Sequence, residues 1–204
     1  TAYVDGTATG STYNIGTSTN LSGKNTVFIS RFFSSSSFFF SGHMEDIRIT
    51  KGLAVYTGNF TAPTGQLTKT WDSNNLGGYA NLTNIASNTD SSKVKLLIHG
   101  NHAKFTDSGD VSGTAHNITP TGSFHSEGHG AIAPALTWPA SLKKTGSAGV
   151  YFDGNGDYLT ISSGPNFNGG AFTYEWWMYP QANPTNTMLI DTRDSSNTSN
   201  MRIW

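Results

Sequence analysis

The sequence predicts an all-β protein, and three observations support this fold class. The 204 residues include 23 glycines, which suits a fold with many turns. Aromatic residues make up 12% of the chain, more than a disordered polar segment would carry. In residues 172–179, apolar and aromatic side chains recur with a period of two, which is the strand signature. Aromatic residues on both faces of this segment predict a strand that packs against a second sheet.

The first strands are expected near the N-terminus. Residues 1–16 fit two short strands around an Asp5-Gly6 turn, since both residue types tolerate the positive φ angles of a tight hairpin. Residues 26–33 predict a further strand.

The segment 44–50 is expected to be a half-buried strand. Its alternation directs Ile47 and Ile49 toward the core. The outward-facing set is Asp46, Arg48 and Thr50.

Residues 67–93 are rich in glycine, asparagine, serine and threonine, which predicts a linker or an extended arm. Within it, Trp71 and Tyr79 are expected to pack on a neighbouring part of the protein. A new strand begins at residue 94, with Val94, Leu96 and Ile98 on one face. Further strands are expected within 150–161, 172–179, 188–192 and 201–204.

Two stretches carry a resemblance to a known family. VYFDGNGDYLTI at 150–161, followed by FTYEWWMYP at 172–180, resembles the start of a laminin-G-like (LamG-like) domain of the concanavalin A-like lectin/glucanase superfamily. GHMEDIRITKGLAVYTGNFTAP at 42–63 resembles the end of such a domain, especially the version found in phage tail-fibre and bacterial surface proteins. The resemblance implies an antiparallel β-sandwich with a jelly-roll topology.

The order of these stretches is the reverse of their order in the family. We therefore expect two partial domains in tandem, severed from a longer array. Residues 1–66 would be the C-terminal part of one sandwich, 67–93 a linker, and 94–204 the N-terminal part of the next. Two alternatives are a permuted single domain, in which 1–63 completes 94–204, and an exchange of halves between protomers.

Composition excludes several functions. The formal net charge is −1, so no overall field draws the chain to nucleic acid or to an anionic membrane, and we expect no nucleic-acid binding. No apolar run reaches the length of a membrane span, so we expect no membrane insertion. The chain has no cysteine, which excludes disulfides, thiolate chemistry and cysteine-ligated zinc.

The loop DGNGD at 153–157 is a candidate calcium site. Asp153, Asn155 and Asp157 would supply alternating oxygen ligands. The alternative, which the abundance of Asn-Gly and Asp-Gly turns favours, is a β-turn whose aspartates cap free amides. A second metal candidate is the His-Glu-His spacing in residues 125–129, although its glycines favour a loop in which the ligands do not align.

A candidate ligand-binding surface lies on the strand 172–180. Trp177 and Tyr179 share a face with Glu175, and aromatic rings beside polar groups can bind sugars in lectin-like sandwiches. The alternative is that these rings are buried for packing alone. Glu45 and Asp46 are adjacent, so a regular strand would direct them to opposite faces and prevent a hydrolytic carboxylate pair. We therefore expect no enzymatic activity.

The resemblance implies a structural or adhesive segment of a phage tail fibre or virion appendage, at the virion surface or outside the cell. Its partners would be other copies of the chain, fibre or virion proteins, and a host-surface glycan or protein. The alternatives are a carbohydrate-binding module of a bacterial surface protein or carbohydrate-active enzyme, and a purely architectural spacer.

Overall fold

The computed structural model describes residues 1–10, 26–32, 37–100, 116–122, 144–145, 149–162, 170–181, 187–192 and 202–203. Within these ranges every strand pair is antiparallel and there is no α-helix, which confirms the all-β prediction. No helix in the described part of the chain could cross a membrane. The strands are β1 (Ala2–Val4), β2 (Thr7–Thr9), β3 (Thr26–Ile29), β4 (Ser41–Lys51), β5 (Val94–Ile98), β6 (Asn117–Thr121), β7 (Val150–Asp153), β8 (Tyr158–Ser162), β9 (Phe172–Pro180), β10 (Ile190–Asp191) and β11 (Arg202–Ile203), with one 3₁₀ turn at Ser91–Lys93.

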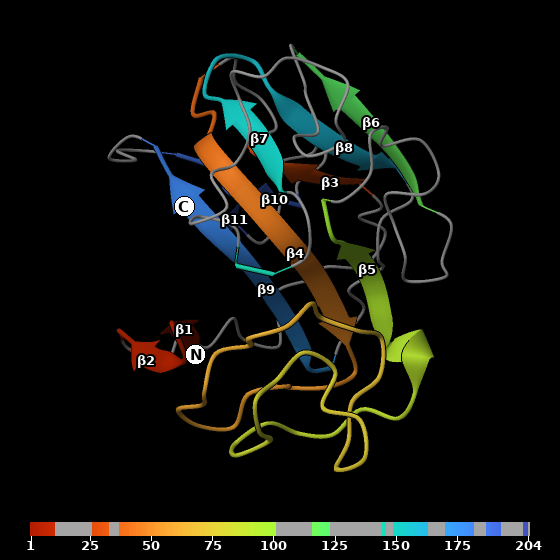
Figure 1. The fold of residues 1–204 in the computed structure, drawn as a ribbon. Helices are drawn as coiled ribbons and strands as arrows, with labels where there is room; N and C mark the ends of the chain where they lie inside the picture. The colour runs from red at the N-terminus through yellow and green to blue at the C-terminus, as the bar shows by residue number, and fades with distance from the viewer. Residues whose placement is uncertain are drawn as a thin grey trace.

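Two main sheets form the body of the molecule (Figure 1). One has the order β11-β10-β3-β8-β6. The other is built around β4, which pairs with β9 along one edge over residues 42–51. The opposite edge of β4 is shared, because β7 pairs with residues 41–44 and β5 with residues 47–50.

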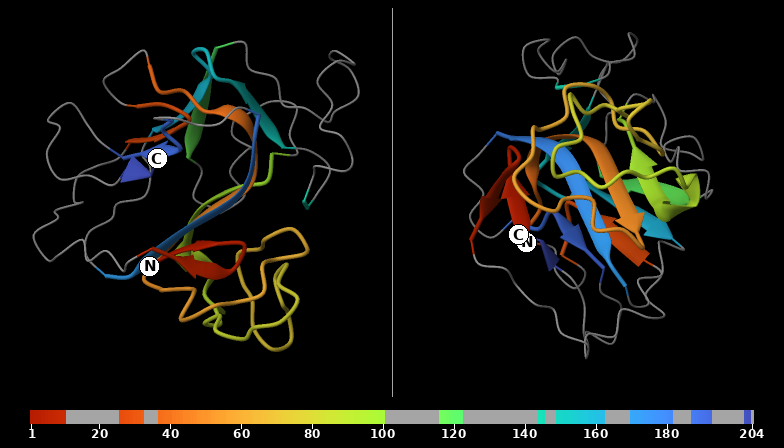
Figure 2. Two further views of the ribbon diagram at one scale, coloured as in Figure 1. Left: turned by 90° about the vertical axis from the view of Figure 1, so that its left-hand side faces the viewer. Right: turned by 90° about the horizontal axis from the view of Figure 1, so that it is seen from below.

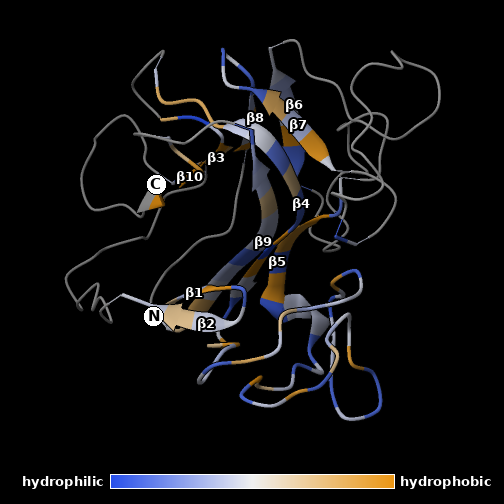
Figure 3. Cartoon of the chain, turned by 60° about the vertical axis from the view of Figure 1, so that its left-hand side comes forward, coloured by the Kyte–Doolittle hydropathy of each residue, from blue (hydrophilic) through white to orange (hydrophobic). Residues whose placement is uncertain are grey.

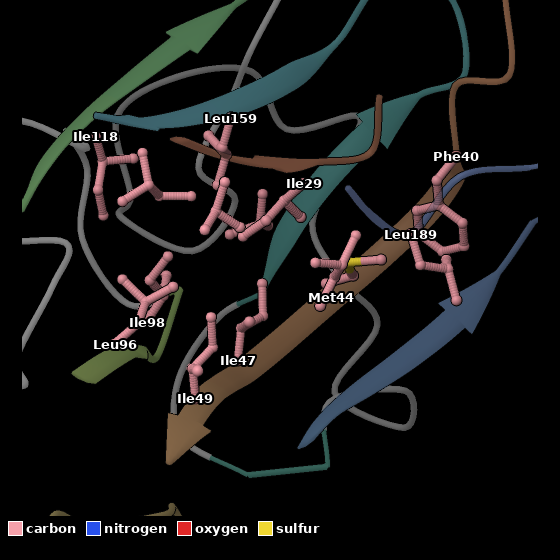
Figure 4. Packing of buried hydrophobic residues seen from close by; sticks show 14 of the residues in the cluster. Ile29, Phe40, Met44, Ile47, Ile49, Leu96, Ile98, Ile118, Leu159 and Leu189 are labelled. Carbon is pink, nitrogen blue, oxygen red and sulfur yellow. The ribbon is translucent and has the colours of Figure 1, made fainter. Parts of the chain in front are cut away.

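The hydrophobic core lies between these two sheets and draws side chains from both, in a sandwich-like arrangement (Figure 4). Its buried members are Val27, Ile29, Phe40, Met44, Ile47, Ile49, Leu96, Ile98, Ile118, Val150, Phe152, Leu159, Ile161, Leu189 and Ile190. The alternate residues Phe172, Tyr174 and Trp176 of β9 pack against this core, as the period-two pattern predicts.

The pairing differs from the two separate partial sandwiches expected from the sequence. β3 and β4, from the segment 1–66, pair with β5, β7, β8, β9 and β10, from the segment 94–204. This is the pairing of the permuted alternative. The strands pair in this way because both edges of β4 need hydrogen-bond partners, and the later strands supply them. The division of a longer protein into tandem domains remains a prediction.

The segment 53–93 is folded onto the sheet, so the predicted linker at 67–93 is not an extended arm. It covers one end of the β4–β5–β9 sheet, as the two views of Figure 2 show, and its loops are mostly hydrophilic in colour in Figure 3. Its apolar side chains nevertheless form a second buried cluster: Val55, Leu67, Trp71, Tyr79, Ile85, Val94 and Leu97. Trp71 is 0% exposed, so the predicted packing of the Trp71–Tyr79 pair is confirmed.

Val94 belongs to this second cluster, whereas Leu96 and Ile98 face the main core. The prediction that all three share a face is therefore wrong. The register between β4 and β5 shifts between Ile49 and Thr50, which changes the parity of the strand at that point.

The short β1–β2 hairpin turns at Asp5 and Gly6, whose φ angles are 47° and 80°, as predicted for this dipeptide. It packs beside the second cluster, where the Tyr3 ring contacts Tyr56 and Phe60 edge-on.

β4 contains a bulge that determines the site described below. Its register with β9 shifts between Glu45 and Arg48, and Asp46 has a φ of 50°. Met44 and Ile47 both face the main core although they are three residues apart. The two residues between them, Glu45 and Asp46, therefore both point to the opposite face of the sheet.

Candidate functional site

An aromatic row crosses the face of the β4 sheet that points away from the main core. Tyr179 of β9 lies directly across from His43 of β4, and His43 lies across from Tyr151 of β7. The rings of His43 and Tyr151 are 4.9 Å apart between centroids. Tyr179 is 43% exposed, whereas His43 is 4% exposed. Burial lowers the pKa of His43 to about 4, so this ring is neutral at physiological pH.

Trp177 lies two residues before Tyr179 and on the same face of the sheet, next to the bulge. It is the cross-strand partner of Glu45. The ammonium group of Lys144 lies 4.9 Å from the centre of the Trp177 ring, within the range of a cation–π contact. The structure thus places one of the predicted ligand residues, Trp177, beside a lysine that the sequence did not single out.

The carboxylates of the bulge bind the segment that carries this lysine. Glu45 Oε1 accepts hydrogen bonds from the backbone amides of Lys144, at 3.0 Å, and Thr145. Asp46 Oδ2 accepts from the Thr145 hydroxyl, at 2.6 Å, and from the Leu67 amide, at 3.1 Å. These contacts hold two segments that are distant in sequence, residues 144–145 and the chain at Leu67, against the bulge of β4.

Asp46 also contacts a histidine. His99 Nδ1 lies 2.6 Å from Asp46 Oδ1, and the Asp46 carboxylate is fully buried. Glu45 is 1% exposed, and this burial is the main reason why its pKa rises to about 7, with the charge of Asp46 adding to the effect.

This arrangement corrects the prediction that Glu45 and Asp46 face opposite ways. The bulge turns both carboxyl groups to one side, where the same hydroxyl, that of Thr145, reaches each of them. The prediction that Asp46, Arg48 and Thr50 face outward is right about the face but wrong about exposure. All three are buried, because segment 53–93 and residues 144–145 lie over them.

Glu175, which is predicted to bind ligand together with Trp177 and Tyr179, is buried and does not lie at the surface. It is 9% exposed, and its Oε1 accepts a hydrogen bond from Arg48 Nε at 2.6 Å. Its Oε2 accepts from the hydroxyls of Tyr56 and Tyr79. With both oxygens engaged inside the protein, Glu175 is part of the packing of segment 53–93 and is not grouped with the exposed ring of Tyr179.

Arg48 is the centre of this buried polar cluster. Its Nη1 donates to the Thr68 carbonyl at 2.7 Å, its Nη2 donates to the Tyr79 hydroxyl, and its guanidinium carbon lies 4.0 Å from the centre of the Trp71 ring. Burial and the charge of Glu175 raise the pKa of the Tyr79 hydroxyl above its ordinary value, so it stays protonated and can donate.

The predicted calcium loop forms a turn that carries the chain from β7, in one sheet, to β8, in the other. Asp153 Oδ1 accepts from the Asn155 amide at 2.6 Å, and Asp157 Oδ2 accepts from the Asp153 amide at 3.1 Å. Asp157 is 1% exposed. These contacts are those of an aspartate-capped turn, and calcium binding by Asp153, Asn155 and Asp157 stays a prediction. The His-Glu-His spacing at 125–129 lies outside the described ranges.

Sequence reasoning missed the roles of His43, His99, Lys144 and Thr145. One signal was present for the bulge: Met44 and Ile47 are apolar residues three apart within a strand, which a regular period of two cannot bury on one face. Nothing in the sequence pairs residues 144–145 with residue 45, which lies about a hundred positions earlier.

No protein-family model, no curated protein and no solved structure matches this chain.

Proposed function

We propose that this chain is a non-enzymatic, adhesive β-sandwich segment of a phage tail fibre or virion appendage, with the jelly-roll topology of LamG-like and concanavalin A-like domains. Its ligand would be a host-surface glycan or protein, bound at the virion surface or outside the cell. Other copies of the chain and fibre or virion proteins would be its structural partners. The resemblance of residues 42–63 and 150–180 to LamG-like segments supports this proposal.

The observation that carries the adhesive role is the aromatic row Tyr179–His43–Tyr151. Three ring-bearing residues form one register row across three neighbouring strands, and the exposed ring of Tyr179 at its end is of the kind on which sugar rings stack. Tyr179 is 43% exposed at one end of this row, and Tyr151 at the other end is partly buried. The same surface would serve the alternative of a carbohydrate-binding module.

The positions of the carboxylates support the non-enzymatic part of the proposal. Glycosidases place two carboxyl groups roughly 5 to 9.5 Å apart on either side of a bound sugar. Glu45 and Asp46 are 1% and 0% exposed and contact the same hydroxyl of Thr145, so a sugar ring cannot enter between them.

The experiment is a glycan-array screen of the wild-type chain and of Tyr179→Ala, together with a reducing-sugar assay. We expect the wild type to bind a set of glycans and Tyr179→Ala to lose this binding. Leu76→Ala is the matched control, because Leu76 is similarly exposed, at 38%, but lies in segment 53–93 at the other end of the sheet.

Each other outcome has a defined meaning. A wild-type chain that binds no glycan would favour a protein ligand or the architectural spacer. Release of reducing sugar from any bound polysaccharide would contradict the non-enzymatic proposal. Equal binding by Tyr179→Ala and wild type would move the ligand site away from the aromatic row.

A further inference from the structure

The turn between β7 and β8 exposes an asparagine that is followed by a glycine. Asn155 is exposed to solvent at the tip of residues 153–157, and Gly156 comes next in the chain. The turn carries the chain from one main sheet to the other, at the top of Figure 1. Asparagine is one of the thermolabile residue types, because its side-chain amide carbon can be attacked by the backbone nitrogen of the following residue. A bond between these two atoms closes a five-membered ring.

The backbone nitrogen of Gly156 is open to this reaction. Gly156 has no side chain to shield the nitrogen, and its φ of 95° is one that glycine adopts without strain. A Cβ built at Gly156 would meet no atom within 4 Å, so the space around it is open. The Gly156 N–H donates no hydrogen bond to a described residue, whereas the Asn155 amide donates to Asp153 Oδ1 at 2.6 Å. The turn thus holds Asn155 in place and leaves the attacking atom free.

The reaction needs only water as a co-reactant. The Gly156 nitrogen loses its proton and attacks Cγ of Asn155, the Cγ–Nδ2 bond breaks, and ammonia leaves with that proton. Water then opens the five-membered imide at one of its two C–N bonds. Cleavage at Cγ gives aspartate, and cleavage at the main-chain carbonyl carbon gives isoaspartate, whose main chain is one atom longer. Both products carry one negative charge that asparagine lacks.

We propose that Asn155 is a site of spontaneous deamidation in the folded protein, and that its isoaspartate form loosens the turn that joins the two sheets. The proposal does not depend on any ligand or on the proposed function.

The two sides of the turn leave no room for a longer main chain. A Cβ at Gly154 would lie 2.8 Å from the Cβ of Ser41, and a Cβ at Gly122 would lie 2.0 Å from Asp157 Oδ1. Asp157 is 1% exposed, and its Oδ2 accepts from the Asp153 amide at 3.1 Å. An extra main-chain atom between Asp153 and Asp157 must displace some of these contacts. An ordinary aspartate at the exposed tip displaces none of them.

Other exposed asparagines provide a comparison within the same chain. Asn75 and Asn117 are exposed, but they precede Leu76 and Ile118, whose side chains shield the nitrogen that would attack. Asn117 also lies in β6, where pairing with β8 holds the backbone extended. A second Asn-Gly pair, at 168–169, lies outside the described ranges, so the experiment must distinguish it from Asn155.

The test is tandem mass spectrometry of the full chain after incubation at neutral and at mildly alkaline pH. We expect fragments that contain Asn155 to gain about 1 Da with time, in two products that chromatography separates. The gain should be faster at the higher pH, because the attacking nitrogen must lose its proton. Fragments that contain Asn75 or Asn117 should stay unchanged over the same period.

Two variants test the structural consequence. Asn155→Gln keeps an exposed amide but would have to close a six-membered ring, so position 155 should stay intact. Asn155→Asp carries the charge of the product on a main chain of normal length. We expect the melting temperature of the wild type to fall more on incubation than that of Asn155→Gln, a comparison in which any change at Asn168 cancels. Fresh Asn155→Asp should melt close to the fresh wild type.

The same incubation in urea shows whether the folded turn protects Asn155. Deamidation of Asn155 in the unfolded chain but not in the folded one would overturn the proposal, as would no deamidation in either. An equal fall in melting temperature for wild type and Asn155→Gln would overturn the role of isoaspartate. None of these measurements contains a ligand, so each result leaves the glycan-array test of the proposed function unaffected.

Discussion

Arg48 Nε donates to Glu175 Oε1 at 2.6 Å, although 127 residues separate the two positions in sequence. The residues are direct cross-strand partners, and both side chains lie on the face of the sheet that segment 53–93 covers. A fully buried guanidinium must be paired, because an isolated charge in the interior is costly. The pair therefore links the register of β4 and β9 to the docking of a third segment.

Glu175→Ala should destabilise the protein strongly. It leaves the buried charge of Arg48 without its carboxylate, a change that costs about 3–5 kcal/mol in other proteins. Urea unfolding followed by circular dichroism measures the free energy of unfolding. The double variant Arg48→Met, Glu175→Met should recover part of this loss, since it removes both charges at once. If Glu175→Ala changes the free energy of unfolding by less than about 1 kcal/mol, the pair is not buried as described.

Trp71→Ala should also destabilise the protein, by about 3–5 kcal/mol, because it leaves a cavity in the second buried cluster. The measurement is the shift of the urea midpoint. Leu76→Ala, in the same segment but 38% exposed, should change stability by no more than about 0.5 kcal/mol. Equal stability of Trp71→Ala and wild type would restore the prediction that 67–93 is an extended linker.

The burial of His43 predicts a loss of stability in acid. The pKa of His43 is about 4 in the folded protein, compared with the ordinary value of 6.5. Between pH 4 and pH 6.5, His43 is therefore protonated in the unfolded chain but neutral in the folded one. The contribution of His43 is fully present above pH 6.5 and is lost as the pH falls toward 4. His43→Phe keeps a ring against Tyr151 but cannot titrate.

The measurement compares the free energy of unfolding of wild type and His43→Phe from about pH 8 to pH 4. The difference between them isolates His43 from Glu45, which titrates in an overlapping range with the opposite sign. We expect the wild type to lose stability relative to the variant as the pH falls below 6.5. Parallel pH profiles for the two proteins would argue that His43 is exposed to solvent.

Calcium should leave the melting temperature unchanged. In the turn at 153–157, a carboxylate oxygen of each aspartate already accepts a hydrogen bond from the backbone of the turn. A ligand that binds only the folded form must raise the melting temperature, so scanning calorimetry with calcium and with a chelator is decisive. A melting temperature that rises with added calcium in the wild type, but not in Asp153→Asn, would instead support the predicted calcium site.

The sequence contains enough information to predict the strands but not how they pair. The alternation in 172–179 and the inward positions of Ile47 and Ile49 follow from a period of two, which depends only on local geometry. The pairing of β4 with β5, β7 and β9 depends on contacts between distant segments, and the period of two in each strand carries no information about those contacts.

The candidate site was less predictable than the strands. Trp177 and Tyr179 stood out because aromatic residues on an outer strand face are conspicuous. The sequence argues against a carboxylate pair at Glu45 and Asp46, because a regular strand directs adjacent side chains to opposite faces. In the structure, the positive φ of Asp46 turns both side chains to the same face. The role of Lys144 follows from hydrogen bonds across the fold, and no local pattern marks it.

The central position of β4 has a consequence for how the chain reaches this structure. Its longest partner, β9, ends at Pro180, so a chain emerging from the ribosome holds β4 without that partner until residues 172–180 have also been made. Topologies dominated by such distant pairings fold slowly, on timescales of roughly milliseconds to seconds, and leave strand edges open to association with other chains in the meantime. Production of this protein should therefore be sensitive to temperature and to chaperone supply.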